Sequence, residues 1–374
     1  MGYGNIAERG HLPAYRMRRE PFAASRQFEI VAIADLSEAR LRAAQIATAA
    51  SGARLYRSYR ELFAAERNRV DFVDIATPPC DHAVIAHAAL DCGFHVLCEK
   101  PLATRRDDAR ALLDHALAKE RVIYPCHNYR HAPVVKAAQK ILDSGAIGHV
   151  QLVTLDTFRT THARGAPEWR PDWRRERTIA GGGIAMDHGA HTFYLAMNWL
   201  RAAPTAITAK MSTRGRSDTE DTIACTVSFP NALAIATLTW TAGVRKVIYT
   251  LHGERGAIRV EDDHIEVTTL ATRGGEKAPR ADSAESRRTE ERVSSQWMDA
   301  SHVSWFETMQ DHFAQAIDAN DYAGAEAVDA LRCVELIGCA YTSALDGSRE
   351  VALPGAARDL ELPPAVGSAK ERAS

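Results

Sequence analysis

The feature that most constrains this sequence is the alternation of short apolar runs with helical patterns between about residues 28 and 127. The apolar runs cover residues 28–34, 70–76, 95–98 and 122–126, and residues 82–92 and 107–119 between them have helical spacing. Strands buried on both faces and joined by helices form a parallel sheet. The order predicts a doubly wound α/β domain over residues 1–127.

A different pattern follows a helix predicted over residues 133–143. Residues 150–158, 205–211, 222–229, 233–240 and 247–252 are predicted strands, which indicates an α+β domain with an open-faced, mostly antiparallel sheet over residues 128–353. We expect the helix over residues 186–200 to line this sheet. Residues 273–295 are polar and predict a mobile excursion, and residues 354–374 a flexible tail.

Size and composition fit this two-domain plan. The chain has 374 residues, which exceeds the usual size of one core. Lys plus Arg number 46 against 48 Asp plus Glu, a balance that argues against a nucleic-acid or membrane partner and favours a small molecule. The 7 cysteines form no Cys-x-x-Cys pair and are expected to be reduced. The sequence shows neither a signal peptide nor a long apolar run, so we expect a cytoplasmic protein.

A possible nucleotide-binding turn opens the chain. Gly2-Tyr3-Gly4-Asn5-Ile6-Ala7 has Gly-x-Gly-x-x-Ala spacing, in which Gly2 permits a tight turn and Gly4 lets the backbone approach a pyrophosphate at a helix N-terminus. An ordinary turn of small residues is the alternative. Such folds have an apolar strand before the first glycine, and here only Met1 precedes Gly2. We therefore expect the natural start to lie upstream of Met1.

Two further segments complete the expected cofactor site. Asp35 ends the apolar run at residues 30–34, where a carboxylate accepts hydrogen bonds from a ribose diol; a solvated strand-end Asp is the alternative. Thr77 and Pro78 close the next strand, where such sheets place a loop against the cofactor. Because a carboxylate repels a 2'-phosphate, Asp35 favours NAD over NADP.

Charged residues at Glu99-Lys100-Pro101 follow a buried strand directly. Charges in that position are functional or paired, and the carboxyl edge of a parallel sheet is where ligands bind. Lys100 is therefore a candidate site residue, with a structural Glu99–Lys100 ion pair as the alternative.

A second cluster follows three glycines, Gly181-Gly182-Gly183. Asp187 and His191 are four residues apart and project from one helix face, so the carboxylate is expected to orient the imidazole as a general base. A capping Asp beside a buried core His is the alternative. His188 points away from that face and is secondary.

The order of these motifs along the chain matches the order found in a known protein family. Gly2-x-Gly4, Glu99-Lys100-Pro101, Asn128-Tyr129-Arg130 and the glycines with Asp187-x-x-x-His191 together resemble the Gfo/Idh/MocA family of NAD(P)-dependent sugar and polyol oxidoreductases, from residue 2 to about residue 353. The resemblance implies a Rossmann domain followed by an open-faced sheet domain, with the substrate between them. It also implies that Lys100, Asp187 and His191 face the substrate.

The expected reaction is reversible alcohol oxidation, with His191 removing the hydroxyl proton and Lys100 stabilising the oxygen. Asn128, Arg130, Trp169 and Trp173 are candidate substrate contacts, although they could equally tie loops together or pack. Two alternatives stay open: an NAD-dependent glycosidase, and a non-catalytic dinucleotide sensor. The open sheet favours a homo-oligomer. No metal is expected, because His127 and His131 have no obvious third ligand.

Overall fold

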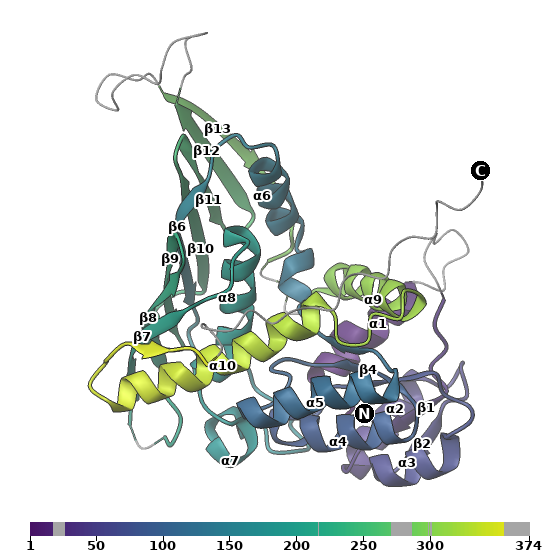
Figure 1. The fold of residues 1–374 in the computed structure, drawn as a ribbon. Helices are drawn as coiled ribbons and strands as arrows, with labels where there is room; N and C mark the ends of the chain where they lie inside the picture. The colour runs from purple at the N-terminus through teal and green to yellow at the C-terminus, as the bar shows by residue number, and fades with distance from the viewer. Residues whose placement is uncertain (18–26, 216, 271–285, 298, 300, 355–374) are drawn as a thin grey trace, which may run out of the picture.

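The computed structural model describes residues 1–17, 27–215, 217–270, 286–297, 299 and 301–354. It has two parts, a tall sheet covered by helices on one side and a smaller α/β unit below it (Figure 1). Within the described residues, no helix is long and apolar enough to cross a membrane. The tail predicted over residues 354–374 falls almost wholly outside them.

The smaller unit contains five short parallel strands in two groups. β1 (Ala32–Ala34) pairs with β2 (Arg54–Tyr56), and β3 (Phe72–Ile75) pairs with β4 (His95–Cys98), which pairs with β5 (Ile123–Pro125). The helices are α2 (Glu38–Ala47), α3 (Tyr59–Glu66), α4 (Pro79–Asp91) and α5 (Arg106–Lys119). Ser37 and Ser58 cap α2 and α3 by accepting from backbone amides. The strand predicted at residues 95–98 is confirmed, whereas β1 is shorter than predicted.

Met1 and Gly2 join the two strand groups. The Gly2 amide donates to the Ala34 carbonyl at 2.9 Å, and the Ala76 amide donates to the Met1 carbonyl at 2.8 Å. These two residues thus lie between β1 and β3, where the sequence predicts a strand before the glycine turn. The chain then enters the π-helix η1 (Ala7–His11) and α1 (Leu12–Met17).

The larger part is a nine-stranded sheet in the order β13-β12-β11-β10-β6-β9-β8-β7-β14. β6 and β9 pair in parallel and all other neighbours are antiparallel. The predictions for β6 and β8 are confirmed. The strands are β6 (Val150–Phe158), β7 (Ala206–Ser212), β8 (Thr222–Phe229), β9 (Ala232–Thr239), β10 (Lys246–Gly253), β11 (Gly256–Glu261), β12 (His264–Leu270), β13 (Ser286–Arg292) and β14 (Val351–Ala352).

Part of the predicted mobile excursion at residues 273–295 is wrong. Residues 273–285 lie outside the described residues, but Ser286–Arg292 forms β13, paired with β12 in register. This strand is exposed along its whole length, so it lacks the apolar alternation that identifies a half-buried strand. Backbone pairing with β12 holds this segment as a strand, because its exposed side chains add no buried apolar contacts.

Helices α6 (Pro133–Asp143) and α8 (Ile184–Leu200) cover one face of the sheet (Figure 1). Inward side chains of the strands and α8 form one core, with Trp199 against Tyr249 at a 5.5 Å ring separation. The helix predicted to line the sheet is therefore confirmed. The short helices are η2 (Asn128–His131), η3 (Trp173–Arg175) and α7 (Arg177–Ala180).

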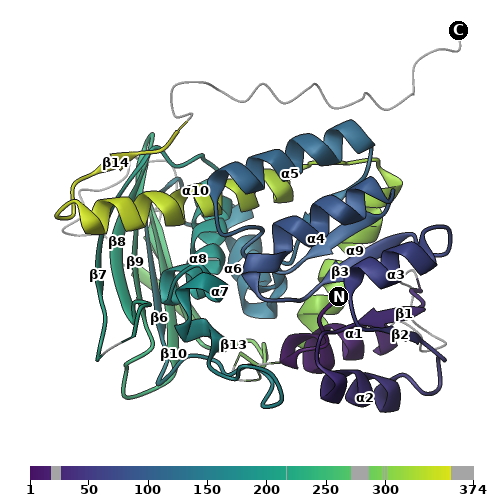
Figure 2. The same ribbon diagram turned by 90° about the horizontal axis from the view of Figure 1, so that it is seen from below.

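The last two helices return to the smaller unit. In α9 (Val303–Asp318), Phe306, Met309 and Phe313 pack with residues of β4 and β5. The first half of α10 (Ala325–Leu345) joins the core of the smaller unit, and the second half packs against the sheet (Figure 2). The boundary between residues 127 and 128 remains a prediction.

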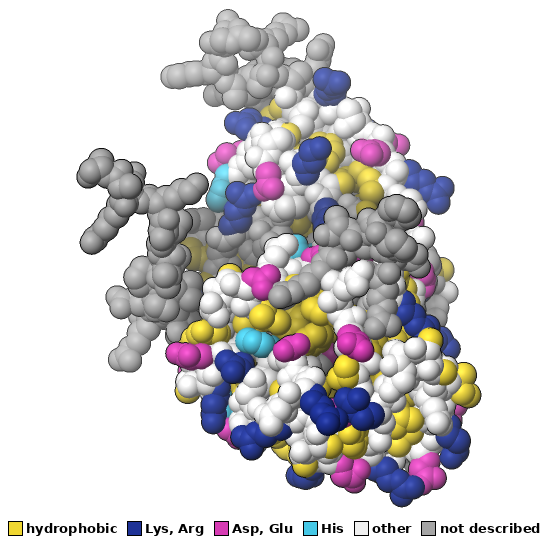
Figure 3. Space-filling model, turned by 90° about the vertical axis from the view of Figure 1, so that its right-hand side faces the viewer, with side chains coloured by type: hydrophobic (Ala, Val, Ile, Leu, Met, Phe, Trp, Pro, Cys, Tyr) yellow, Lys and Arg dark blue, Asp and Glu magenta, His cyan; other side chains and the backbone are white. Residues whose placement is uncertain are grey.

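Both signs of charge are present on the face seen in Figure 3. This agrees with the near-balance of basic and acidic residues in the sequence.

Candidate active site

A cavity of about 710 Å³ is lined by residues from both parts of the molecule. It collects nearly all the side chains singled out from the sequence. These are Gly2, Gly4, Asn5, Ile6, Asp35, Thr77, Pro78, Glu99, Lys100, Asn128, Trp169, Trp173, Asp187 and His191. Arg130 does not line it.

The glycine turn forms one end of this cavity. Gly2 has φ +76°, and a Cβ there would lie 2.9 Å from the Ala76 carbonyl oxygen and from a methyl of Thr77, so only glycine fits without strain. Gly4 borders open space within the cavity, and the helix begins just after it. The first amides of a helix have no intrahelical partner and are suited to bind an anion. The turn therefore fits a pyrophosphate.

Asp35 is fixed beside this turn. Its Oδ2 accepts from the Tyr3 amide at 2.6 Å and its Oδ1 from the Ser37 amide at 2.7 Å. A carboxylate has further lone pairs, so Asp35 can still accept from a ligand hydroxyl. This geometry fits the adenosine ribose of a dinucleotide.

Lys100 and Asp187 meet across the cavity from different parts of the chain. Lys100 Nζ lies 2.8 Å from the Asp187 carbonyl oxygen and 3.3 Å from its Oδ1, and Arg174 Nε lies 3.2 Å from the same Oδ1. Burial alone would raise the pKa of Asp187, but Arg174 and Lys100 hold it well below its usual range. Asp187 is therefore an ionised partner of two cations.

His191 has a different partner. Its Nδ1 lies 2.8 Å from the Tyr194 hydroxyl, and its ring stacks on Tyr129 with centroids 3.9 Å apart. Burial and then Lys100 lower the pKa of His191 well below its usual range, so the ring is neutral. The prediction that Asp187 orients His191 is wrong: within the described residues the Asp187 carboxylate contacts Lys100, Arg174 and His188.

The start of α8 explains the three glycines. The carboxylate of Glu220 accepts from the amides of Gly183 and Ala185, both at 2.9 Å, and so caps the helix. A Cβ on Gly183 would lie 1.9 Å from the Glu220 carbonyl oxygen, and one on Gly182 would meet the Tyr341 hydroxyl. The glycines allow close packing that fixes where Asp187 and His191 lie.

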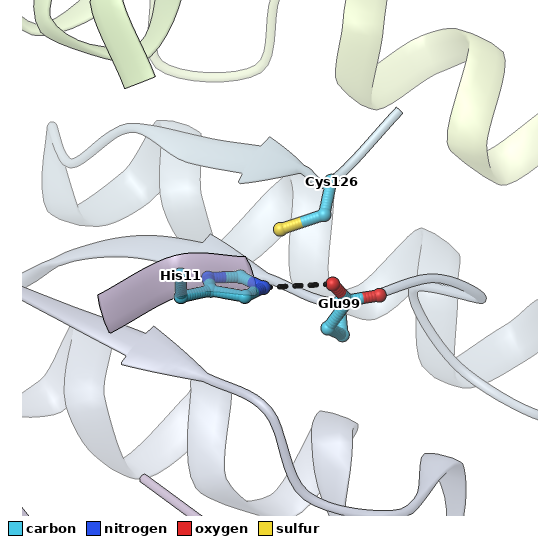
Figure 4. A group of neighbouring side chains, drawn as sticks. All are labelled: His11, Glu99 and Cys126. Atoms are coloured by element: carbon cyan, nitrogen blue, oxygen red, sulfur yellow. Dashed lines mark hydrogen bonds and ion pairs between the residues drawn. The ribbon is translucent and has the colours of Figure 1, made fainter. Parts of the chain in front are cut away.

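Glu99 belongs to a buried cluster behind Lys100. His11 Nε2 lies 2.8 Å from Glu99 Oε1 (Figure 4), and His11 Nδ1 lies 2.7 Å from Asp74 Oδ2. Burial alone would lower the pKa of His11, but Asp74 and Glu99 raise it to about 10. Glu99 Oε2 in turn accepts from the Lys100 amide at 3.2 Å. The cluster thus connects η1 to the backbone of Lys100.

Cys126 lies close enough to His11 and Glu99 to complete a set of three potential metal ligands (Figure 4). Both imidazole nitrogens are already bonded to carboxylates, and burial raises the pKa of the Cys126 thiol well above its usual range. Because a metal needs a deprotonated thiol and an open nitrogen, we interpret these groups as a hydrogen-bonded ion cluster.

Arg130 is the predicted site residue that the structure contradicts. It is paired with Glu326 and with Asp329 (3.0 Å to Oδ2), and His127 lies 3.1 Å from the same Glu326. Its guanidinium therefore ties η2 to α10, which was the alternative considered for it. Nothing in the sequence around Arg130 reveals partners almost 200 positions later.

Several residues of the site, either lining the cavity or bonded to a residue that does, were missed from the sequence. Tyr194 could have been found, because it lies three positions after His191 on the same helix face. Arg159 directly follows an apolar strand, the same signal that identified Lys100. The remaining residues lie in loops or helix starts without a pattern of their own: Tyr129, Arg174, Arg245 and His302.

Comparison with known proteins agrees with this geometry. Residues 1–127 match the family model "Oxidoreductase family, NAD-binding Rossmann fold", and residues 135–259 match "GFO/IDH/MocA C-terminal domain". Levoglucosan dehydrogenase of Pseudarthrobacter phenanthrenivorans is 30% identical over 222 residues, 50% of this chain and 55% of that protein. A dTDP-3,4-didehydro-2,6-dideoxy-alpha-D-glucose 3-reductase of Streptomyces violaceoruber is 34% identical over 59% of this chain and 57% of that protein. The chain thus spans about half the length of these curated relatives.

Among solved structures, levoglucosan dehydrogenase in complex with NADH and levoglucosan has a TM-score of 0.76 at 24% identity, covering 93% of this chain and 97% of that one. An oxidoreductase domain protein from Kribbella flavida has a TM-score of 0.77 at 21% identity, covering 94% and 97%. These similarities show the fold, a Rossmann domain followed by a mostly antiparallel sheet domain.

Proposed function

Because this chain belongs to the Gfo/Idh/MocA family of oxidoreductases, we propose that it transfers hydride between NAD and a hydroxyl or carbonyl carbon of a sugar or polyol. The observation that carries the proposal is the shared cavity. Lys100 from the Rossmann domain and His191 from the sheet domain line the same space as the glycine turn and Asp35. The proposed cofactor site and the proposed reaction site are therefore parts of one continuous cavity.

The nucleotide end fits NAD. The amides after Gly4 would hold the pyrophosphate, and Asp35, already fixed by two amides, would accept the ribose hydroxyls. The Asp35 carboxylate would repel a 2'-phosphate, so NADP is the poorer ligand. When bound, NAD supplies the hydride acceptor or donor.

Proton transfer falls to His191. The ring is held neutral and can accept the hydroxyl proton at Nε2 when Nδ1 carries its own hydrogen. Nδ1 then carries a hydrogen both before and after that transfer, so the Tyr194 hydroxyl oxygen can accept from it throughout. Tyr194, rather than Asp187, is the positioning residue of the imidazole.

Lys100 would donate a hydrogen bond to the same substrate oxygen and stabilise the negative charge that develops there. Asp187 holds the ammonium in place through its carbonyl and carboxylate oxygens. Asn128, Trp169 and Trp173 line the cavity and would contact the rest of the sugar. The predicted homo-oligomer and cytoplasmic location stay predictions.

The test is a panel of sugars and polyols with NAD⁺ and NADP⁺, read by NADH absorbance, with a chromogenic glycoside assay in parallel. We expect NADH formation with at least one substrate and a preference for NAD⁺. Glycoside cleavage without net NADH, or NAD binding without turnover of any substrate, would contradict the proposal.

A further inference from the structure

Two arginines lie at the end of one strand pair beside the proposed reaction site. Arg159 directly follows β6 and Arg245 directly precedes β10, and the register pairs Phe158 with Lys246. Both side chains line the cavity. The strand pairing therefore places two guanidinium groups at one end of the sheet.

Arg159 is 8% exposed and donates to two backbone carbonyls, of Phe158 at 3.0 Å and of Lys246 at 3.5 Å. Within the described residues no carboxylate pairs with it. Arg245 donates to the Trp297 carbonyl at 3.1 Å, and burial followed by the charge of Arg159 lowers its pKa. Arg159 is thus a buried cation without a carboxylate partner, which is costly unless an anion joins it.

His302 adds a third polar group to this end of the cavity. Its ring stacks on Trp305 with centroids 3.8 Å apart, it is 7% exposed, and its Nδ1 has no hydrogen-bond partner. Burial and then Arg245 hold its pKa at about 3, so the ring is neutral. A buried polar atom without a partner inside a ligand cavity is suited to a ligand.

The ring of Tyr129 contacts both His302 and His191, and so connects the two arginines' end of the cavity to the proposed reaction site. The Tyr129 ring stacks on His191 and meets His302 edge-on at 5.7 Å. A sugar-sized ligand with its reacting carbon at His191 would therefore bring another of its substituents to Arg159, Arg245 and His302.

Arg159 carries the charge that a ligand can meet here. Asp187 is paired with Lys100 and Arg174. Asp262 and Asp299 both act on Arg245, and they are also bonded, respectively, to the Val247 amide and Lys246 and to the amide and hydroxyl of Ser301. The positive charge of Arg159, which has no carboxylate partner within the described residues, is therefore available to a ligand, and Arg245 lines the cavity beside it.

We infer that the substrate is an acidic sugar or polyol, whose carboxylate or phosphate is bound by Arg159 and Arg245 with a hydrogen bond from His302. The inference rests on the proposed function, because it takes the reacting carbon to lie at Lys100 and His191. It adds that the substrate is negatively charged, and it leaves the proposed hydride transfer unchanged.

The test compares matched ligands on the NADH-loaded protein by isothermal titration calorimetry. The pairs are D-glucuronate with D-glucose and D-gluconate with D-glucitol, and D-glucose 6-phosphate distinguishes phosphate from carboxylate. We expect an acid to bind at least about 10-fold more tightly than its neutral partner. Equal or weaker binding of all the acids would overturn the inference.

Variants then locate the effect. Arg159→Gln and, independently, Arg245→Gln should weaken acid binding by about 10- to 100-fold, a larger loss than for the neutral partner, and Arg159→Lys should recover part of that loss. The matched control is Arg259→Gln, an exposed arginine on β11 paired with Glu261. Equal losses for acid and neutral ligands in both Gln variants would overturn the inference.

The two proposals fail separately. Acid binding that depends on Arg159, without NADH formation from any substrate, would contradict the oxidoreductase function and leave the anion site standing. NADH formation from neutral sugars alone would support the oxidoreductase function and contradict the anion site.

Discussion

The hydroxyl oxygen of Tyr194 lies 2.8 Å from Nδ1 of His191 and also accepts the Tyr129 amide at 3.0 Å. The two side chains are one turn apart on α8, and the ring of Tyr129 stacks on His191. One tyrosine hydroxyl therefore fixes both the imidazole and the backbone of the residue that stacks on it.

Replacing Tyr194 by Phe should lower kcat by about 10- to 100-fold, because His191 loses its partner and a buried amide is left unpaired at a cost of about 1–3 kcal/mol. NADH affinity should not change, since Tyr194 does not line the cavity. Steady-state kinetics across pH 5–10 gives the measurement. Tyr124→Phe, a buried tyrosine of β5, is the control, and an unchanged kcat and pH profile in Tyr194→Phe would contradict the assigned role.

Lys100→Ala should lower kcat by about 100-fold or more, since a charged donor at the reacting oxygen is removed. The fold should survive, because Asp187 keeps Arg174 as a partner. Fluorescence titration with NADH should show binding within a few-fold of the wild type. Nearly full turnover by this variant would exclude Lys100 from the reaction.

Asp35→Ala should weaken NAD⁺ binding by about 10-fold, because a carboxylate acceptor for the ribose hydroxyls is lost. NADP⁺ binding should improve relative to NAD⁺ once the negative charge is gone. The ratio of kcat/KM for the two cofactors measures this change. Glu38→Gln, an exposed carboxylate on α2, is the control, and an unaltered ratio in Asp35→Ala would count against NAD selection by Asp35.

The His11 cluster should make stability sensitive to alkaline pH. The pKa of His11 is raised from 6.5 in the unfolded chain to about 10. Its contribution is therefore complete below about pH 6.5 and is lost as the pH rises toward 10. Thermal melts of the wild type and of His11→Gln should converge across this range. A constant difference between the two melting temperatures from pH 6 to 10 would show that His11 does not titrate in this way.

Arg130→Met should destabilise the fold by about 3–5 kcal/mol, because Glu326 and Asp329 would lose a buried cation. Chemical denaturation gives the free energy of unfolding. NADH affinity at a temperature where the variant is folded should equal that of the wild type. A weaker affinity with unchanged stability would instead return Arg130 to the ligand site.

What the sequence predicted well was local. The run at residues 95–98 is a buried strand because its apolar pattern continues up to Cys98, and Lys100 follows at the sheet edge for the same reason. Asp187 and His191 share a helix because of their spacing. Lys100, Asp187 and His191 could therefore be identified from the hydrophobic periodicity and from the positions of the charged residues.

What the sequence did not predict depends on contacts between distant segments. Asp187 pairs with Lys100 rather than His191 because the two domains meet there, and Glu326 captures Arg130 from across the chain. β13 has no apolar pattern and is a strand only because β12 pairs with it. Such partners are set by tertiary packing, which local spacing does not encode.

The return of α9 and α10 to the smaller unit has a consequence for biosynthesis. Phe313 and Leu331 complete hydrophobic cores most of whose other members were translated some 200 residues earlier. Until α9 has been synthesised, the side chains of Leu97 and Tyr124 in the smaller unit lack the apolar residues that cover them in the folded protein. The two halves of this chain are therefore expected to mature together rather than one after the other, and nascent chains that stall before residue 303 should be substrates for chaperones.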